Sequence, residues 1–463
     1  MVSNSAALTP GLSSFLKSLK TTPIETSIDN LVSLLKRRQI RLSRSCAIAT
    51  AYLLLRVVSA FRTTDAARLI ERVQSVGRRL MIAQPRELVV GNIVRRVLGL
   101  IRDEAEDERD ADFFMASEAG SDSRPHTPHG AESHSPPRSH AGFGDDHIIP
   151  VHDKDLSYLR QEGSERSSSR PPLSSSPSVQ GPPVISMFSL LQHPEIGSPQ
   201  PSSPGTASPS GRFQAQGQHR DVRAEVLDGI GEIIDELGQV DDQIAGYALE
   251  HIHSNEVILT YTSSATVQKF LLKAASKRKF TVIHAESYPN DHDATHSRVS
   301  GNAENDEEHL NVESFQKPLT ALGITVILIP DSAVFAIMSR VNKVILGTHS
   351  VLANGGLVAA AGTRVIARAA KVHQTPVVVV SGVYKLSPVY PFDTESLIEY
   401  GDPSNVIPYE DGDLVDKVDV DNPLYDYVPA ELVDLYITNL GGHAPSYLYR
   451  IVSDHYRKED ITF

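Results

Sequence analysis

The first hundred residues repeat apolar side chains at intervals of three and four. In residues 24–40, IETSIDNLVSLLKRRQI, the repeat includes Ile28, Leu31 and Leu35. The segments AARLIERVQSVGRRLMIA and ELVVGNIVRRVLGLI continue it. Such spacing places apolar side chains on one face of a helix. The pattern therefore predicts an all-helical N-terminal domain at residues 1–104.

After residue 255 the apolar residues form short continuous runs separated by helical patterns. The runs are EVILTY, FTVIHAE, ITVILIP, NKVILG and TPVVVVSG. Continuous Val and Ile runs are typical of strands buried on both faces, and their alternation with helices favours a parallel sheet. We expect an α/β fold: a doubly wound, mostly parallel, Rossmann-like domain at residues 255–463. Residues 221–254 read as its helical lead-in.

The stretch between these two patterns has a different composition. Ser, Pro and Gly make up 45 of the 94 residues at 117–210. Such a segment cannot bury enough apolar surface to offset the entropy of ordering it. We therefore predict a disordered insertion at residues 105–220. Six histidines lie between His126 and His152, but metal ligands need a fixed geometry, so no metal site is predicted.

Charge is distributed unevenly along the chain. The net charge is -13, yet residues 1–100 hold sixteen Lys and Arg against five Asp and Glu, a local +11, so residues 101–463 carry -24. The basic part suits an acidic partner, protein or RNA. We expect no DNA partner.

Cysteine content and apolar runs indicate the compartment. The single cysteine, Cys46, excludes an internal disulfide and fits a reducing compartment. No signal-peptide pattern is present, and the apolar run CAIATAYLLLRVV breaks at Arg56 before reaching the ~20 residues of a spanning helix. These features predict a soluble, cytosolic protein without a membrane partner.

Three loops follow the carboxyl ends of the predicted strands, where ligands of parallel sheets bind. They are TYTSSAT (260–266), PDSA (330–333) and GTHSVLANGG (347–356). The Gly pair that ends the third loop is expected to open a small-residue helix, whose N-terminus would suit a phosphate. Asp331 is expected to cap the helix that follows it.

Longer segments resemble a known family. VILGTHSVLANGGLVAAAGT and NPLYDYVPAELVDLYITNLGG are similar to the methylthioribose phosphate isomerase fold family and its regulatory relatives in translation initiation. Within that family, LEHIHSNEVILTYTSSATVQKFLLKAASKRKFTVIHAE, SRVNKVILGT, KLSP and DYVPAEL look like the beta regulatory subunits of the guanine-nucleotide exchange factor for translation initiation factor two. The resemblance is close over residues 221–463 and loose over residues 1–104.

The resemblance also implies that isomerase chemistry is lost. Where the isomerases read like LTHCN, with a catalytic cysteine, LTYTS has Thr262. Where they have the aspartate of a GADRI-like loop, GTHSV has His349, and where NGDxxNKxGT supplies an Asn-Lys pair, NGGLVAAAGT has Ala359 and Ala360. A Thr hydroxyl does not ionise near neutral pH, and losing the lysine removes a charged contact to phosphate. No second ionisable group beside His349 is apparent in the matching loops, so no catalytic residue and no cofactor are assigned.

The function implied by the resemblance is that of a non-catalytic regulatory subunit of the exchange factor. Its implied partners are the alpha, gamma, delta and epsilon subunits, together with initiation factor two and its phosphorylated alpha subunit, which a stress response would use to slow exchange. Arg37, Arg38 and Arg41 are candidate contacts for the phosphorylated partner, because arginine binds phosphate with two parallel hydrogen bonds. Leu432 and Tyr436 are candidate contacts for another subunit.

Two alternatives remain open from the sequence. A sugar-phosphate or nucleotide-binding module would use backbone donors of a degenerate phosphate loop. A pentose-phosphate isomerase is the less favoured alternative. The candidate loop residues are Asn354, Gly355, Gly356, Gly362 and Thr363.

Overall fold

The structure is a computed structural model in which not every residue is described. It describes residues 11–61, 65–119, 222–287, 310, 312–390, 392–407, 410, 412 and 417–462. Most of the predicted disordered insertion lies outside these residues, so that prediction is not addressed. Residues 105–119, however, continue a helix past the predicted boundary at 104. The sequence there, AEDERDADFFMASEA, is rich in Ala and Glu, which favour helix.

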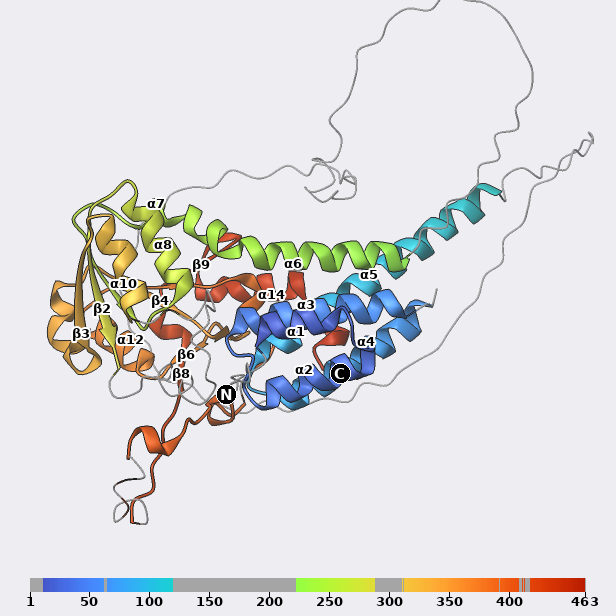
Figure 1. The fold of residues 1–463 in the computed structure, drawn as a ribbon. Coiled ribbons are helices and arrows are strands. Elements are labelled where there is room, and N and C mark those ends of the chain that lie inside the picture. The colour runs from blue at the N-terminus through green and yellow to red at the C-terminus, as the bar shows by residue number, and fades with distance from the viewer. Residues whose placement is uncertain are drawn as a thin grey trace, which may run out of the picture. The chain divides into compact units, whose positions relative to one another are not determined.

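Helices make up the N-terminal segment, as predicted (Figure 1). Pro23 occupies the N-cap of the second helix, where its missing N–H costs nothing. A long helix, α6, follows the gap in the described chain and contacts α3, α5 and α8. The helices are α1 (Leu12–Leu19), α2 (Ile24–Lys36), α3 (Ser43–Ala60), α4 (Ala66–Ala83), α5 (Leu88–Ala119), α6 (Val222–Gly246), α7 (Ala248–His251), α8 (Ala265–Ala275), α10 (Val312–Ala321), α11 (Val334–Ile337), α12 (Thr363–Val372) and α14 (Leu448–His455).

A mostly parallel sheet forms the second part, which confirms the predicted fold class. Its strand order is β10-β9-β7-β4-β1-β2-β3, and only the β9–β10 pair is antiparallel. The strands are β1 (Val257–Tyr261), β2 (Thr281–Glu286), β3 (Thr325–Pro330), β4 (Lys343–Gly347), β7 (Val377–Val380), β9 (Leu435–Thr438) and β10 (Gly441–His443).

A second, three-stranded sheet corrects one expectation. It consists of β5 (Ser350–Val351), β6 (Leu357–Ala360) and β8 (Tyr425–Val428), all paired antiparallel. The Gly pair therefore closes a hairpin turn between β5 and β6, and the predicted small-residue helix at this point is wrong. Asn-Gly is a strong hairpin signal, which the small side chains after it had obscured. The helix starts only at Thr363.

Two hydrophobic clusters hold these parts together. One runs without a break from the N-terminal helices through α6 to one face of the large sheet, and it includes Leu54, Leu98, Leu237 and Phe270. The other fills the opposite face of the sheet, under α12 and α14. Because the first cluster is shared, the helical segment and the sheet pack as one unit. Among the described residues, no helix is both long and apolar enough to cross a membrane.

Candidate functional site

The loops after β1 and β4 meet because these strands are neighbours in the sheet. Thr262, in the first loop, has a left-handed backbone (φ 57°), and its N–H donates to the Ala285 carbonyl at 3.1 Å. Gly347 ends β4 so close to Ser264 that a Cβ there would lie 2.6 Å from the serine hydroxyl. The two loops that matter in the isomerases therefore pack against each other with little free space.

His349 follows β4 and is held by the N-terminal helices. The Ser43 hydroxyl, at the start of α3, donates to the His349 carbonyl at 2.8 Å and lies 3.2 Å from its Nδ1. Nε2 lies 3.4 Å from Oε2 of the buried Glu87, and the ring stacks on Tyr425 with centroids 4.4 Å apart. His349 is thus a buried junction between the helices and the sheet.

This environment removes acid-base chemistry at neutral pH. Burial, followed by the charges of Lys385 and Arg38, lowers the pKa of His349 to about 3. Burial, followed by the charge of Glu87, raises the pKa of Tyr425 to about 12. The imidazole is therefore neutral near pH 7 and the phenol stays protonated, so neither exchanges protons in that range.

Sequence reasoning did not find Glu87 as a neighbour of His349. The loops compared with the isomerases showed no second ionisable group beside His349. Glu87 comes instead from the segment just before α5, about 260 residues away in the chain. Nothing local marks it, since a Glu after Pro85 reads as an ordinary helix start. Only the packing of α5 against the loop brings the carboxylate to the imidazole.

The Asn-Gly-Gly turn uses its polar groups internally. The Asn354 side chain accepts from the Gly356 N–H at 2.9 Å and donates to the Tyr427 hydroxyl at 2.9 Å. The Gly355 carbonyl accepts from the Tyr436 hydroxyl at 2.7 Å. Because this turn does not begin a helix, its amides lack the helix-end field that the phosphate prediction assumed.

Gly362 and Thr363 do lie at a helix N-terminus, that of α12. Gly362 is left-handed (φ 98°), and its N–H donates to Asp426 Oδ2 at 2.7 Å. The Arg364 N–H donates to the same oxygen at 3.2 Å, and the Thr363 hydroxyl donates to the Ala360 carbonyl. The structure thus brings Gly362 and Thr363 together at one end of α12, where a carboxylate of the chain is already bound.

The tyrosine next to this helix end experiences negative charge. Burial raises the pKa of Tyr261 to about 12; a hydrogen bond with Ser287 acts against this, and the charges of Asp331, Glu286 and Asp426 raise the pKa by smaller amounts. Negative charge acting at this hydroxyl makes the loop region unfavourable for a phosphate. No group of three or more His, Cys, Asp or Glu side chains among the described residues could hold a metal ion.

The two apolar partner candidates lie inside the protein. Leu432 is 8% exposed and Tyr436 is 0% exposed, and both belong to the cluster on the α12 side of the sheet. The exposure that the prediction assumed is wrong for them: Tyr436 belongs to β9, an interior strand between β7 and β10, and Leu432 packs into the same cluster from the turn before β9. The assignment of Leu432 and Tyr436 as partner contacts stays a prediction, and surface exposure does not support it.

The three candidate arginines differ in their surroundings. Arg38 is left-handed (φ 56°) and forms an ion pair with Glu399 of the C-terminal part. Arg37 is exposed and Arg41 is half-buried. They do not present three equivalent guanidinium groups, and the role of Arg37, Arg38 and Arg41 in binding a phosphorylated partner stays a prediction.

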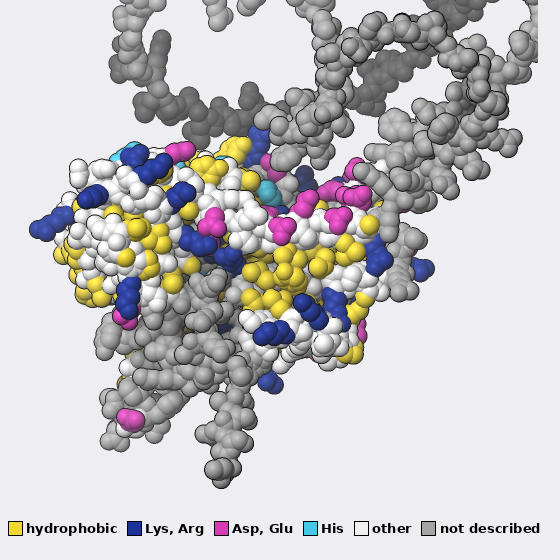
Figure 2. Space-filling view, turned by 45° about the horizontal axis from the view of Figure 1, so that its top comes forward, with side chains coloured by type: hydrophobic (Ala, Val, Ile, Leu, Met, Phe, Trp, Pro, Cys, Tyr) yellow, Lys and Arg dark blue, Asp and Glu magenta, His cyan; other side chains and the backbone are white. Residues whose placement is uncertain are grey.

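Part of the basic charge of the N-terminal helices is used within the chain. Arg44 pairs with Asp241 at 2.8 Å, and Arg96 pairs with Glu236 at 2.7 Å. Figure 2 accordingly shows Lys and Arg scattered among Asp and Glu on the face in view. The acidic partner expected from the charge distribution is therefore, in part, the C-terminal half of the same chain.

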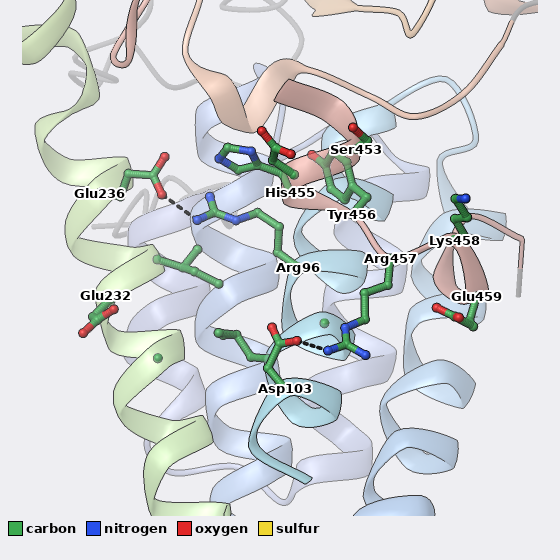
Figure 3. Close-up of a pocket in the computed structure, with 15 residues that line it drawn as sticks. Arg96, Asp103, Glu232, Glu236, Ser453, His455, Tyr456, Arg457, Lys458 and Glu459 are labelled. Atoms are coloured by element: carbon green, nitrogen blue, oxygen red, sulfur yellow. Dashed lines mark hydrogen bonds and ion pairs between the residues drawn. The ribbon is translucent and has the colours of Figure 1, made fainter. Parts of the chain in front are cut away.

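A cleft of about 690 Å3 lies where α5, α6 and the C-terminal residues 453–459 meet (Figure 3). Its walls carry the Arg96–Glu236 pair and the ion pair of Arg457 with Asp103. None of the sequence-predicted site residues lines it. Because these two ion pairs each join different segments, the cleft reads as a junction between segments.

Comparison with known proteins gives consistent matches over nearly the whole chain. The Initiation factor 2 subunit family matches residues 39–299 and 310–445. The chain is 38% identical over 441 residues to translation initiation factor eIF2B subunit beta of Schizosaccharomyces pombe, covering 94% of this chain and 96% of that protein. It is similar to the crystal structure of eIF2B beta from Chaetomium thermophilum, with a TM-score of 0.59 and 31% identity over 98% of each chain. It also matches a chain of the tetrameric eIF2B-beta2-delta2 complex from C. thermophilum, with a TM-score of 0.58 and 31% identity, over 96% of this chain and 100% of that chain.

Proposed function

The chain belongs to the Initiation factor 2 subunit family, as its sequence resemblance indicated, and from this premise we propose that it is a non-catalytic regulatory subunit of the exchange complex for initiation factor two. It is a translation initiation factor subunit of the beta type, similar over its length to proteins of that name. The observation that carries the non-catalytic part is His349, whose pKa of about 3 leaves it neutral. The cytosol, where translation is initiated, is the compartment that fits this role.

The loss of isomerase chemistry can be measured directly. The purified chain should turn over no pentose phosphate, because Thr262 supplies no ionisable group and His349 supplies no proton near neutral pH. Turnover above that of a heat-denatured sample would contradict the proposal. The alternative of a sugar-phosphate or nucleotide-binding module is disfavoured, since the Asp426 carboxylate already accepts from the amides of Gly362 and Arg364.

Assembly with a delta-type subunit is the first part of the proposed role. A similar chain occurs in a complex of beta and delta subunits, which supports this partner, and alpha, gamma and epsilon subunits complete the proposed assembly. The edge strand β3 offers a suitable surface: Ile327 is 45% exposed and Leu328 is 53% exposed, and nearby Phe335 is 58% exposed. Exposed apolar edge strands are normally covered, because they otherwise pair with other chains.

The test is co-assembly of the full chain with a delta-type subunit, measured by analytical ultracentrifugation. Ile327→Lys should weaken assembly by about tenfold or more, because a charge would be buried in the interface. Ile82→Lys is the matched control, since Ile82 is 75% exposed on α4 in the helical segment. Failure of the wild-type chain to assemble would remove the proposed function, whereas equal assembly of both variants would remove only the role of β3.

Recognition of the phosphorylated alpha subunit of initiation factor two is the finer part of the proposal. The exposed Arg37 and half-buried Arg41 support it, since guanidinium groups bind phosphate oxygens in pairs. In assembled complexes, Arg37→Ala with Arg38→Ala and Arg41→Ala should reduce binding of the phosphorylated form more than that of the unphosphorylated form. Arg68→Ala is the control, because Arg68 is a largely exposed arginine of α4 outside the candidate cluster. Equal binding of both forms by the triple variant and the wild type at low salt would contradict this role.

A further inference from the structure

Three basic side chains border two exposed valines on the outer side of α12. Val365 and Val372 stand two helical turns apart and are 66% and 67% exposed. Arg364, Arg368 and Lys371 are exposed as well. Because side chains at intervals of three, four and seven lie on one side of a helix, these five residues form a single stripe, here called the α12 face.

The α12 face has no ionic partner in the part of the chain that the structure describes. There, the Arg368 and Lys371 side chains form no ion pair or hydrogen bond. Arg364 contributes only its backbone N–H, which donates to Asp426. The face thus leaves apolar surface in water beside unpaired positive charge. A segment that is both acidic and apolar would cover the valines and pair with the cations.

A segment of that character leads toward β8. Residues 392–407, here called the acidic arm, hold four Asp and Glu and no Lys, Arg or His. Phe392 is fully exposed, and Tyr400 is 51% exposed. Asp393 and Glu395, beside Phe392, are exposed and form no ion pair with any described residue. An aromatic side chain flanked by two carboxylates is the complement of the α12 face.

The acidic arm is anchored at its base, next to the strands that lead to α12. Glu399 forms an ion pair with Arg38, and its carbonyl accepts from the Leu424 N–H at 2.7 Å. β8 follows the arm and pairs with β6, which precedes α12, and the arm projects beyond both strands (Figure 1). The arm and the α12 face are therefore neighbours in the fold, but the exposure of Phe392 and Val365 shows that they do not cover each other within one copy.

We propose that the acidic arm of one copy of this chain covers the α12 face of a second copy, and the reverse, in a two-fold dimer. Phe392 lies on the valines, and the carboxylates of Asp393 and Glu395 meet the cations. Two-fold symmetry makes both contacts at once, because each copy carries one arm and one face. This self-association goes beyond the proposed function and does not depend on it.

Other occupants fit the α12 face less well. Two such faces packed against each other would bring like charges together. Valines offer no ring on which a nucleic-acid base stacks, and the neighbouring acidic arm repels phosphates. The remaining candidate is a delta-type subunit with an acidic segment of its own, which the experiment distinguishes from a second copy.

Charge reversal tests the contact by sedimentation velocity of the full chain at about 1–100 µM and low salt. The wild type should associate reversibly to a dimer, and added salt should weaken it. Asp393→Lys with Glu395→Lys makes the arm basic, and Arg368→Glu with Lys371→Glu makes the face acidic. Each variant alone should dimerise about tenfold or more weakly. Their equimolar mixture should dimerise again, because the basic arm then meets the acidic face and the acidic arm meets the basic face.

Two further variants control for net charge and for folding. Arg68→Glu with Arg78→Glu, on α4, changes the net charge as the face variant does, and both arginines are exposed. This control should dimerise as the wild type does. Val365→Ser with Val372→Ser removes the apolar part of the face without changing its charge, and should also weaken the dimer about tenfold.

Three results would each overturn the proposal: a wild type that stays monomeric throughout, arm and face variants that dimerise like the wild type, or a mixture that does not recover. If the wild type is monomeric and the face variant no longer assembles with a delta-type subunit, that subunit is the occupant and the second copy is not. Failure of the wild type to assemble with a delta-type subunit removes the proposed function alone, and the self-association is judged separately by its own dimer.

Discussion

Buried ionisable groups are neutral in one region of this molecule and charged in another. At the loop after β4, His349 is enclosed by Ser43, Tyr425 and Glu87, and enclosure lowers its pKa so far that it stays neutral. At the junction of α5 with the C-terminal residues 456–462, the charges persist because each finds a partner. There the buried Asp460 receives hydrogen bonds from the Arg102 guanidinium at 2.9–3.2 Å.

The comparison shows where buried side chains of this chain stay ionised and what the charge contributes there. Burial lowers the pKa of His349 even though the Glu87 carboxylate lies 3.4 Å from its Nε2, and this removes acid-base chemistry near pH 7. Burial with a bidentate partner keeps ionisation and turns it into a link between distant segments, here joining α5 to the C-terminus.

The largest predicted effect at neutral pH concerns the C-terminal junction. Asp460→Ala should lower the free energy of unfolding by about 2–3 kcal/mol, because the Arg102 guanidinium then lacks its acceptor. Arg102 is 25% exposed, so the loss stays below that of a fully buried pair. Urea unfolding would measure it. Asp103→Ala removes an exposed partner of Arg457 and should cost at most about 1 kcal/mol. Equal losses of unfolding free energy in the two variants would show that burial does not set the strength of the ion pairs at this junction.

The next effect concerns pH dependence at the loop after β4. The pKa of His349 is about 3 when folded and about 6.5 when unfolded, so between these values the unfolded chain binds a proton that the folded chain does not. Stability from this group is full above pH 6.5 and falls as the pH drops toward 3, by up to about 1.4 kcal/mol per pH unit. His349→Asn should flatten the pH profile of the unfolding free energy in this window. Glu87, Lys385, Arg38 and Tyr425 surround the ring and remain in the variant.

His443 provides a comparison for that measurement. Burial lowers its pKa as well, but the residue is only partly buried. His443→Asn should therefore change the pH profile less than His349→Asn. A steeper change for His443, or an unchanged profile for His349→Asn, would show that enclosure is not what neutralises the ring after β4.

The smallest predicted effect tests exposed ion pairs in the helical segment. Glu25 is bridged by Arg72 and Arg79 across α2 and α4, but its side chain is 60% exposed. Water screens such pairs, so Glu25→Ala should change the free energy of unfolding by only about 0.2–0.5 kcal/mol. Raising the salt concentration should shrink the difference further. A loss comparable to that of Asp460→Ala would contradict the view that burial sets the value of these pairs.

Local patterns predicted most of the secondary structure and part of the site. The five apolar runs became strands of the large sheet, four of them largely buried as continuous Val and Ile segments predict, while β3 lies at the edge and leaves Ile327 and Leu328 exposed. The replacements at Thr262 and His349 were also visible in the sequence, since they depend only on which side chain stands at a position. The hairpin at Gly355 was missed because small residues after a Gly pair suit a helix or a strand equally, and pairing with β8 decides between them.

Residue identity by itself gave the expectation that isomerase chemistry is absent: the resemblance implies a hydroxyl where the isomerases have a thiol, and alanines where they have an amide and an ammonium group. It also determined the helical and strand periodicities, which are local properties of the chain. Only the tertiary structure decided that Asp426 binds the end of α12, that Glu87 meets His349, and that Tyr436 is buried. Each of these depends on contacts between residues far apart in sequence, and the pKa of a side chain or its exposure is set by those contacts and not by its neighbours along the chain.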